Sequence, residues 1–503
     1  MYDNLRRIFT GLACILYLIL LGYTIAHHEL WGDELHSWNI VKASPSLCAL
    51  FHNMRYEGHP PLWYLILWPL TRVTHELTYM QVIQFVVAGT SMVLILYRAP
   101  LPLGAKLMAP FGYFLFYEYA AFSRNYAIGV LLAVCLCIVL ERGARAASAQ
   151  PRDSGAMSRR FRAALYYLLL LLLSNTHLLG LLLAFSFHVY FLWQRRKWSL
   201  HILGFLILLP AVYFILPPGD SQMNAGFWLG HWDLHRVLIP VEAPLRAFMP
   251  MPAWWEYHWW NTEFLLDVKG LNVVAAVVGP VLAWWALKGS RGGRVLFGVN
   301  VLVTLAAGLV FPLTSARYTG FLFIGFLAAY WVGAVPRARA SGWPLLLLLM
   351  MALQLPGGLF AVWKDWRLPF SRANTAPELV GEVPSGAMLV CDYWALNPLA
   401  AFTDRAYYCI DLGETLSFLR WDGDFAARLR RPDRYVEGAR ALRGATDLTG
   451  ALYLISTASP SELARAAGSN FRVHLEDFRD GAIEKGSNLY LYRIEMPGGG
   501  AGK

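Results

Sequence analysis

Charge is scarce in this sequence. Asp, Glu, Lys and Arg make up only 15% of its 503 residues, whereas hydrophobic residues make up 57% and the mean hydropathy is +0.42. A soluble protein of this length needs more polar surface, so the composition excludes that class and indicates a polytopic membrane protein. The net charge of +10 does not require a nucleic-acid partner, because Arg and Lys concentrate in short loops between apolar runs.

Cysteine is also rare. The six cysteines lack the spacing of a metal site, and Cys14, Cys135 and Cys137 lie in apolar runs, where cysteine is most simply a core residue. Cys391 and Cys409 fall in a polar C-terminal region and could form a disulfide in an oxidising compartment. The sequence lacks an internal repeat. Its first apolar run lacks a convincing cleavage site, so we expect that run to be retained as a helix.

Basic loops orient the chain. Arg6 and Arg7 precede the first apolar run, and the loop 141–162 holds six arginines, whereas the long loops 28–61 and 217–266 are net acidic. Basic loops stay in the cytoplasm, so we expect a cytoplasmic N-terminus and both acidic loops outside. At ~20 residues per crossing, we expect about eleven crossings. The expected spans are residues 8–27, 78–97, 106–121, 124–140, 163–175, 178–194, 199–216, 267–286, 295–313, 318–335 and 342–362.

This count divides the chain into two domains. Residues 1–362 form a mainly helical transmembrane domain, in which 28–77 is a first outer loop with juxtamembrane helices and 217–266 a second. Residues 62–77 are apolar, but a crossing there would move the arginine-rich loop outside. Residues 363–503 are more polar and read as an outer α/β domain with strands at 387–391, 451–455 and 488–493 and a helix at 460–467.

The first outer loop holds the most informative residues. Asp33 and Glu34 lie in the stretch Trp31 to Trp38, a few residues after the first apolar run. Carboxylates this close to lipid cost free energy unless water, a cation or a ligand compensates. The simplest alternative is a solvated loop with an Asp-Glu turn.

Other polar and aromatic residues belong on the same outer side. They are Glu118, Arg124, His177, Arg317 with Tyr318, and the tryptophans Trp228, Trp232, Trp254, Trp255, Trp259 and Trp260. Each has a simpler explanation: arginines snorkel to headgroups, a histidine ends a helix, tryptophans form an interfacial belt, and Glu118 pairs with Arg124. Together they supply a base, cations for phosphate and aromatic surfaces for a sugar, which suits sugar transfer from a lipid phosphate.

The order of these motifs resembles that of GT-C glycosyltransferases of the protein-mannosyltransferase-like group, which includes family 39 and the aminoarabinose transferases. The resemblance covers residues 1–330. It rests on Asp33-Glu34, His59-Pro60-Pro61-Leu62, Ser123-Arg124-Asn125-Tyr126, Thr176-His177 and Arg317-Tyr318. Some relatives carry Lys in place of His59, and Arg-Pro-Tyr is commoner than Arg124-Asn125-Tyr126.

The resemblance implies an inverting transferase that uses a polyprenyl-phosphate sugar donor and a lipid, glycan or protein acceptor. It implies that Asp33 is the general base, with Glu34 a second catalytic candidate. Arg124, Arg317 and His59 would bind the phosphate, and Glu118, Tyr126, His177 and Tyr318 would line the substrate site. It leaves a divalent metal open, because some GT-C enzymes need one.

The resemblance also implies a multi-pass protein of the inner membrane whose active site and C-terminal domain face the periplasm. A lipid-linked sugar transporter or flippase is the main alternative, and an O-antigen ligase or polymerase is another. A transporter would place polar residues near the bilayer midplane, often in repeated halves, and the sequence shows neither feature.

Overall fold

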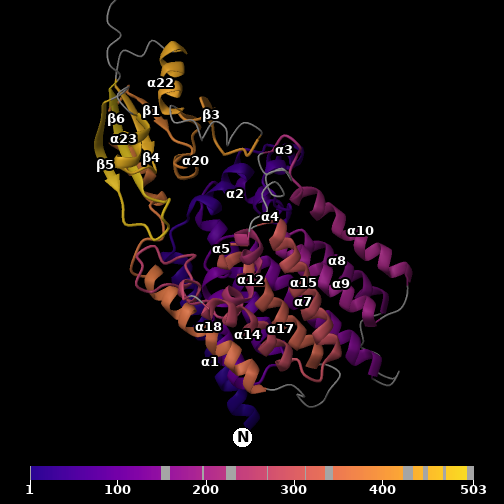
Figure 1. Cartoon of the computed structure of the whole chain (residues 1–503). Helices are drawn as coiled ribbons and strands as arrows, with labels where there is room; N and C mark the ends of the chain where they lie inside the picture. The colour runs from indigo at the N-terminus through magenta and orange to yellow at the C-terminus, as the bar shows by residue number, and fades with distance from the viewer. Residues whose placement is uncertain are drawn as a thin grey trace, which may run out of the picture.

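The computed structural model describes residues 2–148, 159–194, 198–221, 234–268, 270–311, 313–334, 344–422, 434–445, 451–467 and 472–495. A helical bundle holds the N-terminus at one end, and a domain with a sheet lies at the other end (Figure 1). The expected fold class, mainly helical with a C-terminal α/β domain, is therefore confirmed.

The longer helices of the bundle are α1 (Tyr2–His27), α5 (Thr78–Arg98), α7 (Tyr126–Ser148), α8 (Arg159–Ser174), α9 (Leu178–Gln194), α10 (Trp198–Ile215), α12 (Leu234–Phe248), α14 (Leu271–Ala286), α15 (Arg291–Val310), α17 (Phe321–Ala334) and α18 (Pro344–Asp365). Among the described residues, five are long and apolar enough to cross a membrane: α1, α5, α7, α15 and α18. Apolar side chains such as Ile19 and Leu302 are exposed on these helices, as lipid contact requires. The number and direction of the crossings stay predictions.

One expected span is wrong. Residues 106–121 do not form a continuous helix but divide into α6 (Leu103–Met108), the 3-10 turn η2 (Ala109–Phe111) and the π-helical turn η3 (Tyr113–Glu118). Pro110 lacks a backbone N–H, and Gly112 is extended, so the helix ends there. Gly358 of α18 lets this break approach closely, because a Cβ there would lie 2.4 Å from the Phe111 carbonyl oxygen.

The second outer loop also differs from the expectation. Within 217–266, residues Leu234–Phe248 form helix α12, which packs against α14 and α15. Pro240, Glu242 and Pro244 give this stretch the appearance of a loop. The helix forms because one face, which includes Leu245 and Phe248, is buried in the bundle.

The first outer loop is mostly helical. It contains α2 (Gly32–Lys42), α3 (Leu47–Asn53), the 3-10 turn η1 (Met54–Tyr56) and α4 (Leu62–Thr71). The ten residues of α4 span about 15 Å, half of the ~30 Å hydrocarbon core, so α4 is too short to cross. Asp33 and Glu34 lie in the first turn of α2, and the solvated loop that served as the simplest alternative is therefore wrong.

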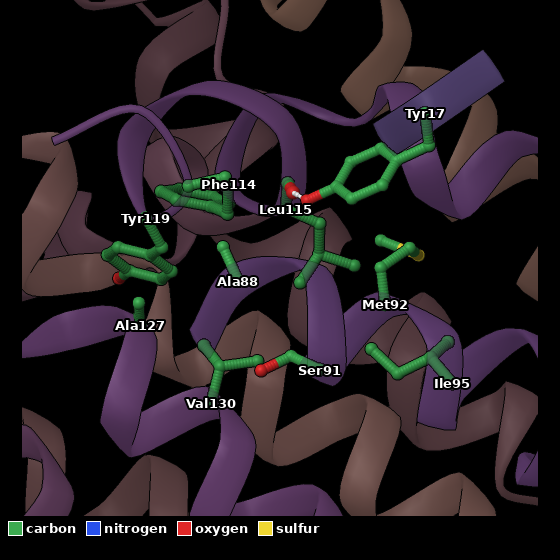
Figure 2. A pocket seen from close by; sticks show the side chains of 11 residues that line it. Tyr17, Ala88, Ser91, Met92, Ile95, Phe114, Leu115, Tyr119, Ala127 and Val130 are labelled. Atoms are coloured by element: carbon green, nitrogen blue, oxygen red, sulfur yellow. Dashed lines mark hydrogen bonds between the residues drawn. The ribbon is translucent and has the colours of Figure 1, made fainter. Parts of the chain in front are cut away.

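The bundle interior is close-packed. Between α1, α5, η3 and α7 lies a cavity of 10 Å³, where the Tyr17 hydroxyl donates to the Leu115 carbonyl oxygen at 2.9 Å (Figure 2). A space of ~10–15 Å³ holds at most one water. The larger cavity described below therefore differs in kind from the gaps left by helix packing.

The C-terminal domain is built on a six-stranded sheet with the order β3-β2-β1-β4-β6-β5. β1 pairs in parallel with β2 and β4, and the other pairs are antiparallel. The strands are β1 (Met388–Cys391), β2 (Tyr407–Cys409), β3 (Glu414–Leu416), β4 (Leu452–Ser456), β5 (Arg472–Arg479) and β6 (Leu489–Glu495). The described part of this domain also contains the helices α19 (Ala376–Gly381), α20 (Leu396–Thr403), α22 (Arg434–Ala445) and α23 (Pro460–Ala467).

The three expected strands and the expected helix are confirmed as β1, β4, β6 and α23. β2, β3 and β5 were not predicted. Cys391 lies opposite Cys409 in the sheet, but their sulfur atoms are 3.6 Å apart and both thiols are free. The structure therefore brings the two thiols of the expected bridge into contact without a bond between them, and the bridge stays a prediction.

Candidate functional site

A cavity of 230 Å³ opens between the segment Glu57 to His59, the start of α9 and the end of α10. One part of its wall is polar and comes from Glu57, His59, Tyr126, His177 and Tyr318. The rest is apolar and comes from α9, the end of α10 and the segment after α15: Leu178, Leu179, Ile215, Pro217, Phe311 and Leu313. The cavity therefore suits a molecule with a polar head and an apolar chain.

Asp33 lies beside the polar part of this cavity, between two arginines. Its Oδ2 is 2.7 Å from Arg317 Nη1 and 4.0 Å from Arg124 Nη2, and its side chain remains 39% exposed. Enclosure by the protein raises the pKa of Asp33, but the charges of Arg317 and Arg124 outweigh this and hold the pKa below its usual value. Asp33 is therefore an ionised carboxylate with access to solvent.

Arg124 joins three segments of the chain. It follows the broken segment at η3 and donates to the backbone oxygen of Asp33 and to Ser37 Oγ at 3.2 Å. Its Nη2 is 3.4 Å from His59 Nε2. Burial, followed by the charge of Arg124, lowers the pKa of His59 to about 3, so His59 is a neutral acceptor beside the guanidinium.

Arg317 is surrounded by aromatic rings. Its guanidinium carbon lies 5.2 Å from the Trp31 ring, 5.6 Å from Trp260 and 5.1 Å from Tyr318. Cation–π contacts of this kind hold a guanidinium without using its donors. Both arginine side chains are mostly buried and face Asp33, an arrangement that differs from side chains snorkelling to headgroups.

Glu34 does not line the cavity, and its carboxylate binds the backbone of two segments. It accepts from the Trp31 N–H at 3.2 Å, which caps α2, and from the Ser123 N–H in the segment before α7. Its Oε2 is also 3.4 Å from His28 Nε2. These contacts indicate a structural role, and they explain why an adjacent pair of carboxylates diverges.

His28 connects the ends of three helices. Its Nδ1 is 3.0 Å from Asp365 Oδ2 at the end of α18, and its other nitrogen faces Glu34 of α2. Burial alone lowers the pKa of His28, but Asp365 and Glu34 outweigh burial and raise it to about 10. A charged His28 therefore belongs to the folded state at neutral pH.

Glu118 does not pair with Arg124, as the simpler explanation supposed. Its Oε2 accepts from the Tyr113 hydroxyl at 2.9 Å and from Trp260 Nε1 at 3.3 Å. Trp260 belongs with Trp31 and Tyr318 to the arginine cage, the group of aromatic rings around Arg317. Glu118 therefore lies behind Trp260 and does not line the cavity.

His177 lines the cavity and also caps the start of α9. Its Nδ1 accepts from the Gly180 N–H at 3.0 Å, at the start of α9. The proton of a neutral His177 is then on Nε2. The His177 ring lies 4.7 Å from the Tyr126 ring, and Tyr126 stacks on Tyr119 at 5.4 Å. Tyr126, His177 and Tyr318 all line the cavity.

The tryptophans of the second loop do not form one group. Trp259 is buried, Trp260 belongs to the arginine cage, and Trp254 and Trp255 are exposed. The last two fit the expected interfacial belt. Trp228 and Trp232 lie outside the described residues.

Sequence reasoning missed Glu57 and His36 as site residues. Glu57 lines the cavity, and its Oε2 is 2.8 Å from His36 Nε2 on α2. A signal was present, because His36 follows Asp33 by one helical turn and Glu57 stands two residues before His59. Across the described ranges, no group of three or more His, Cys, Asp or Glu side chains is arranged to hold a metal ion.

The C-terminal domain contacts the helix that carries Asp33. α20 lies against α2 (Figure 1): Asn397 Nδ2 donates to the Gly32 carbonyl oxygen at 3.2 Å, and Asn39 Nδ2 donates to the Asn397 carbonyl oxygen at 3.0 Å. Lys42 Nζ donates to the Ala400 carbonyl oxygen at 2.7 Å. These bonds fix both ends of α2 to the sheet domain.

Comparison with known proteins places the fold. No family model matches the chain, and no curated relative matches it. Among solved structures, the crystal structure of ArnT from Cupriavidus metallidurans in the apo state is similar, with 13% identity, a TM-score of 0.53 and coverage of 98% of each chain. The expected GT-C architecture is therefore confirmed: the chain has an ArnT-like fold throughout both domains, and it is an integral membrane protein.

Proposed function

We propose that this protein is an inverting glycosyltransferase of the GT-C type, which transfers a sugar from a polyprenyl-phosphate donor to an acceptor at the outer face of the inner membrane. One observation carries the proposal: a partly exposed carboxylate lies between two buried arginines, beside a cavity whose other walls are apolar. The ArnT-like fold over 98% of the chain supports it.

The donor would enter from the bilayer with its prenyl chain against the apolar wall at Leu178, Ile215 and Phe311. Its phosphate would meet Arg124 and Arg317, because planar guanidinium groups bind phosphate through paired hydrogen bonds. Both groups are held before the donor arrives, so they can stabilise the charge that develops on the leaving phosphate.

Asp33 would act as the general base. In the free protein the Asp33 carboxylate pairs with the Arg317 guanidinium, and the donor phosphate would compete with the carboxylate for that guanidinium. A carboxylate released from Arg317 has less positive charge beside it and is a stronger base. It would take the proton of the acceptor hydroxyl as that oxygen attacks the anomeric carbon, while the bond from this carbon to the phosphate oxygen breaks. A single displacement releases polyprenyl phosphate and inverts the configuration.

Turnover tests this proposal. Purified protein in lipid nanodiscs would be incubated with radiolabelled undecaprenyl-phosphate sugars and with lipid, glycan and protein acceptors. We expect a labelled acceptor and an equal amount of free undecaprenyl phosphate. The transporter alternative predicts movement of intact donor across proteoliposomes without release of the phosphate, and that result would exclude the transferase.

A further inference from the structure

Glu57 has a carboxylate oxygen without a protein partner. Its side chain is 4% exposed, and its Oε2 lies 2.8 Å from His36 Nε2 and 3.5 Å from the Tyr64 hydroxyl. Its Oε1 is buried and has no hydrogen-bond partner among the described residues, although Glu57 lines the 230 Å³ cavity. A buried acceptor without a donor costs free energy, so a ligand group that donates would stabilise it.

The backbone around Glu57 holds this side chain at the cavity wall. Glu57 ends the turn η1, and Gly58 follows with a φ of +65°, a conformation that favours glycine. The chain then reaches His59 beside Arg124. A short, sharply turned segment therefore brings Glu57 and His59, the neighbour of Arg124, to the same cavity.

The chemistry of the polyprenyl-phosphate sugar limits which part of this lipid Glu57 can bind. A phosphate is anionic and would be repelled by the carboxylate. A prenyl chain has no hydrogen-bond donor. The remaining part of a polyprenyl-phosphate sugar is the sugar, whose hydroxyl or amino groups donate hydrogen bonds.

We propose that Glu57 binds the sugar of the lipid-linked donor through Oε1, and that His36 is a positioning residue that holds Oε2. This rests on the proposed function and adds a specificity-determining residue to it. The two carboxylates of the site then have separate tasks: Asp33 lies between the arginines, and Glu57 binds the transferred sugar at the cavity wall. The sugar bound here is one that presents a donor group toward Glu57.

The test compares lipids with and without a sugar. Binding of undecaprenyl phosphate and of its glucose, mannose and aminoarabinose derivatives would be measured in nanodiscs without acceptor. We expect the wild-type protein to bind at least one derivative more tightly than the bare lipid phosphate. In Glu57→Gln that derivative should bind about ten- to a hundredfold more weakly, the range for a charge-assisted hydrogen bond, and Glu57→Ala should lose more. Affinity for the bare lipid phosphate should not fall in either variant, because the carboxylate does not bind the phosphate.

Controls separate this inference from the proposed function. Glu76→Gln changes an exposed carboxylate of the same outer loop and should bind every lipid as the wild type does. His36→Asn, whose amide is too short to reach Glu57 Oε2, should weaken binding of the sugar derivative and leave binding of the bare lipid unchanged. His36→Gln, whose amide can take the place of Nε2, should recover part of the lost binding. Equal weakening of sugar-bearing and bare lipid in Glu57→Gln would overturn the sugar contact and leave the transferase intact. Failure of the wild type to bind any polyprenyl phosphate would overturn both.

Discussion

Replacing Asp33 with Asn should separate two roles of this side chain: accepting a proton and pairing with Arg317. Asn has nearly the same shape but cannot accept a proton from the acceptor hydroxyl. Since general base catalysis contributes about 10²–10⁴-fold, the single-turnover rate should fall by that factor. The same change removes the anion that occupies Arg317 at 2.7 Å, so the guanidinium becomes free for phosphate.

The donor affinity should therefore move in the opposite direction. The Asp33 side chain is 39% exposed, and partly screened ion pairs contribute about 0.2–1 kcal/mol. Removing this competitor should tighten binding of undecaprenyl phosphate by about 1.4- to 5-fold. The melting temperature should change little, because the lost pair is worth no more than this amount.

The assay measures the single-turnover rate, the dissociation constant of the donor and the melting temperature on three proteins: wild type, Asp33→Asn and the control Asp480→Asn, an exposed carboxylate of the sheet domain. Normal turnover in Asp33→Asn would refute the base. Slow turnover together with weakened donor binding or a large drop in melting temperature would mean that Asp33 is needed for structure, and the reasoning above would fail.

Further predictions concern the arginines, the charged histidine, the sheet domain and the topology. Arg317→Ala should weaken donor binding about ten- to a hundredfold, and Arg317→Lys should recover only part, because Lys lacks the planar fork; normal affinity in both would remove the arginine from the phosphate site. The pKa of His28 is raised from 6.5 to about 10, so its charged form contributes fully to the free energy of unfolding below pH 6.5. That contribution is lost as the pH rises toward 10. The melting temperature of the wild type should therefore fall between pH 6.5 and pH 10, and that of His28→Gln should change less over the same range. Asn397→Leu should lower the turnover number more than donor affinity, because it loosens α2 and leaves the cavity walls in place; equal activity would show that the sheet domain does not position Asp33. Reporter fusions at residues 150 and 370 should report opposite sides of the membrane, and matching sides would contradict the predicted topology.

The sequence was sufficient for features that depend on short spacing or on order along the chain. Ten of the eleven expected spans coincide with a helix, because long apolar runs have few alternatives in a bilayer. The grouping of Asp33, Arg124 and Arg317 could be expected from the order of motifs in a known fold. Their distances could not, because they depend on how α2, the segment before α7 and the short helix α16 (Ala316–Thr319) pack.

The misses have physical causes. Helix α12 contains two prolines that local propensity reads as a loop, and burial of one face overrides it. Glu34 and Asp33 look equivalent in the sequence, yet Glu34 caps the start of α2 and Asp33 faces the two arginines. Glu57 and His36 approach each other only because η1 folds back onto α2, and no spacing rule in a single sequence encodes that approach.

The contact between α20 and α2 also sets an order of events during synthesis. Asn397 bonds to Gly32 across 365 positions of the chain. At about 5–20 residues per second, roughly 20–70 s pass between the emergence of the first partner and the second. Over this interval α2, which carries Asp33, lacks its contact with α20. The end of the bundle that carries Asp33 is therefore completed late in synthesis. A protein truncated after α18 would carry the arginines and the cavity but would lack α20, against which α2 packs.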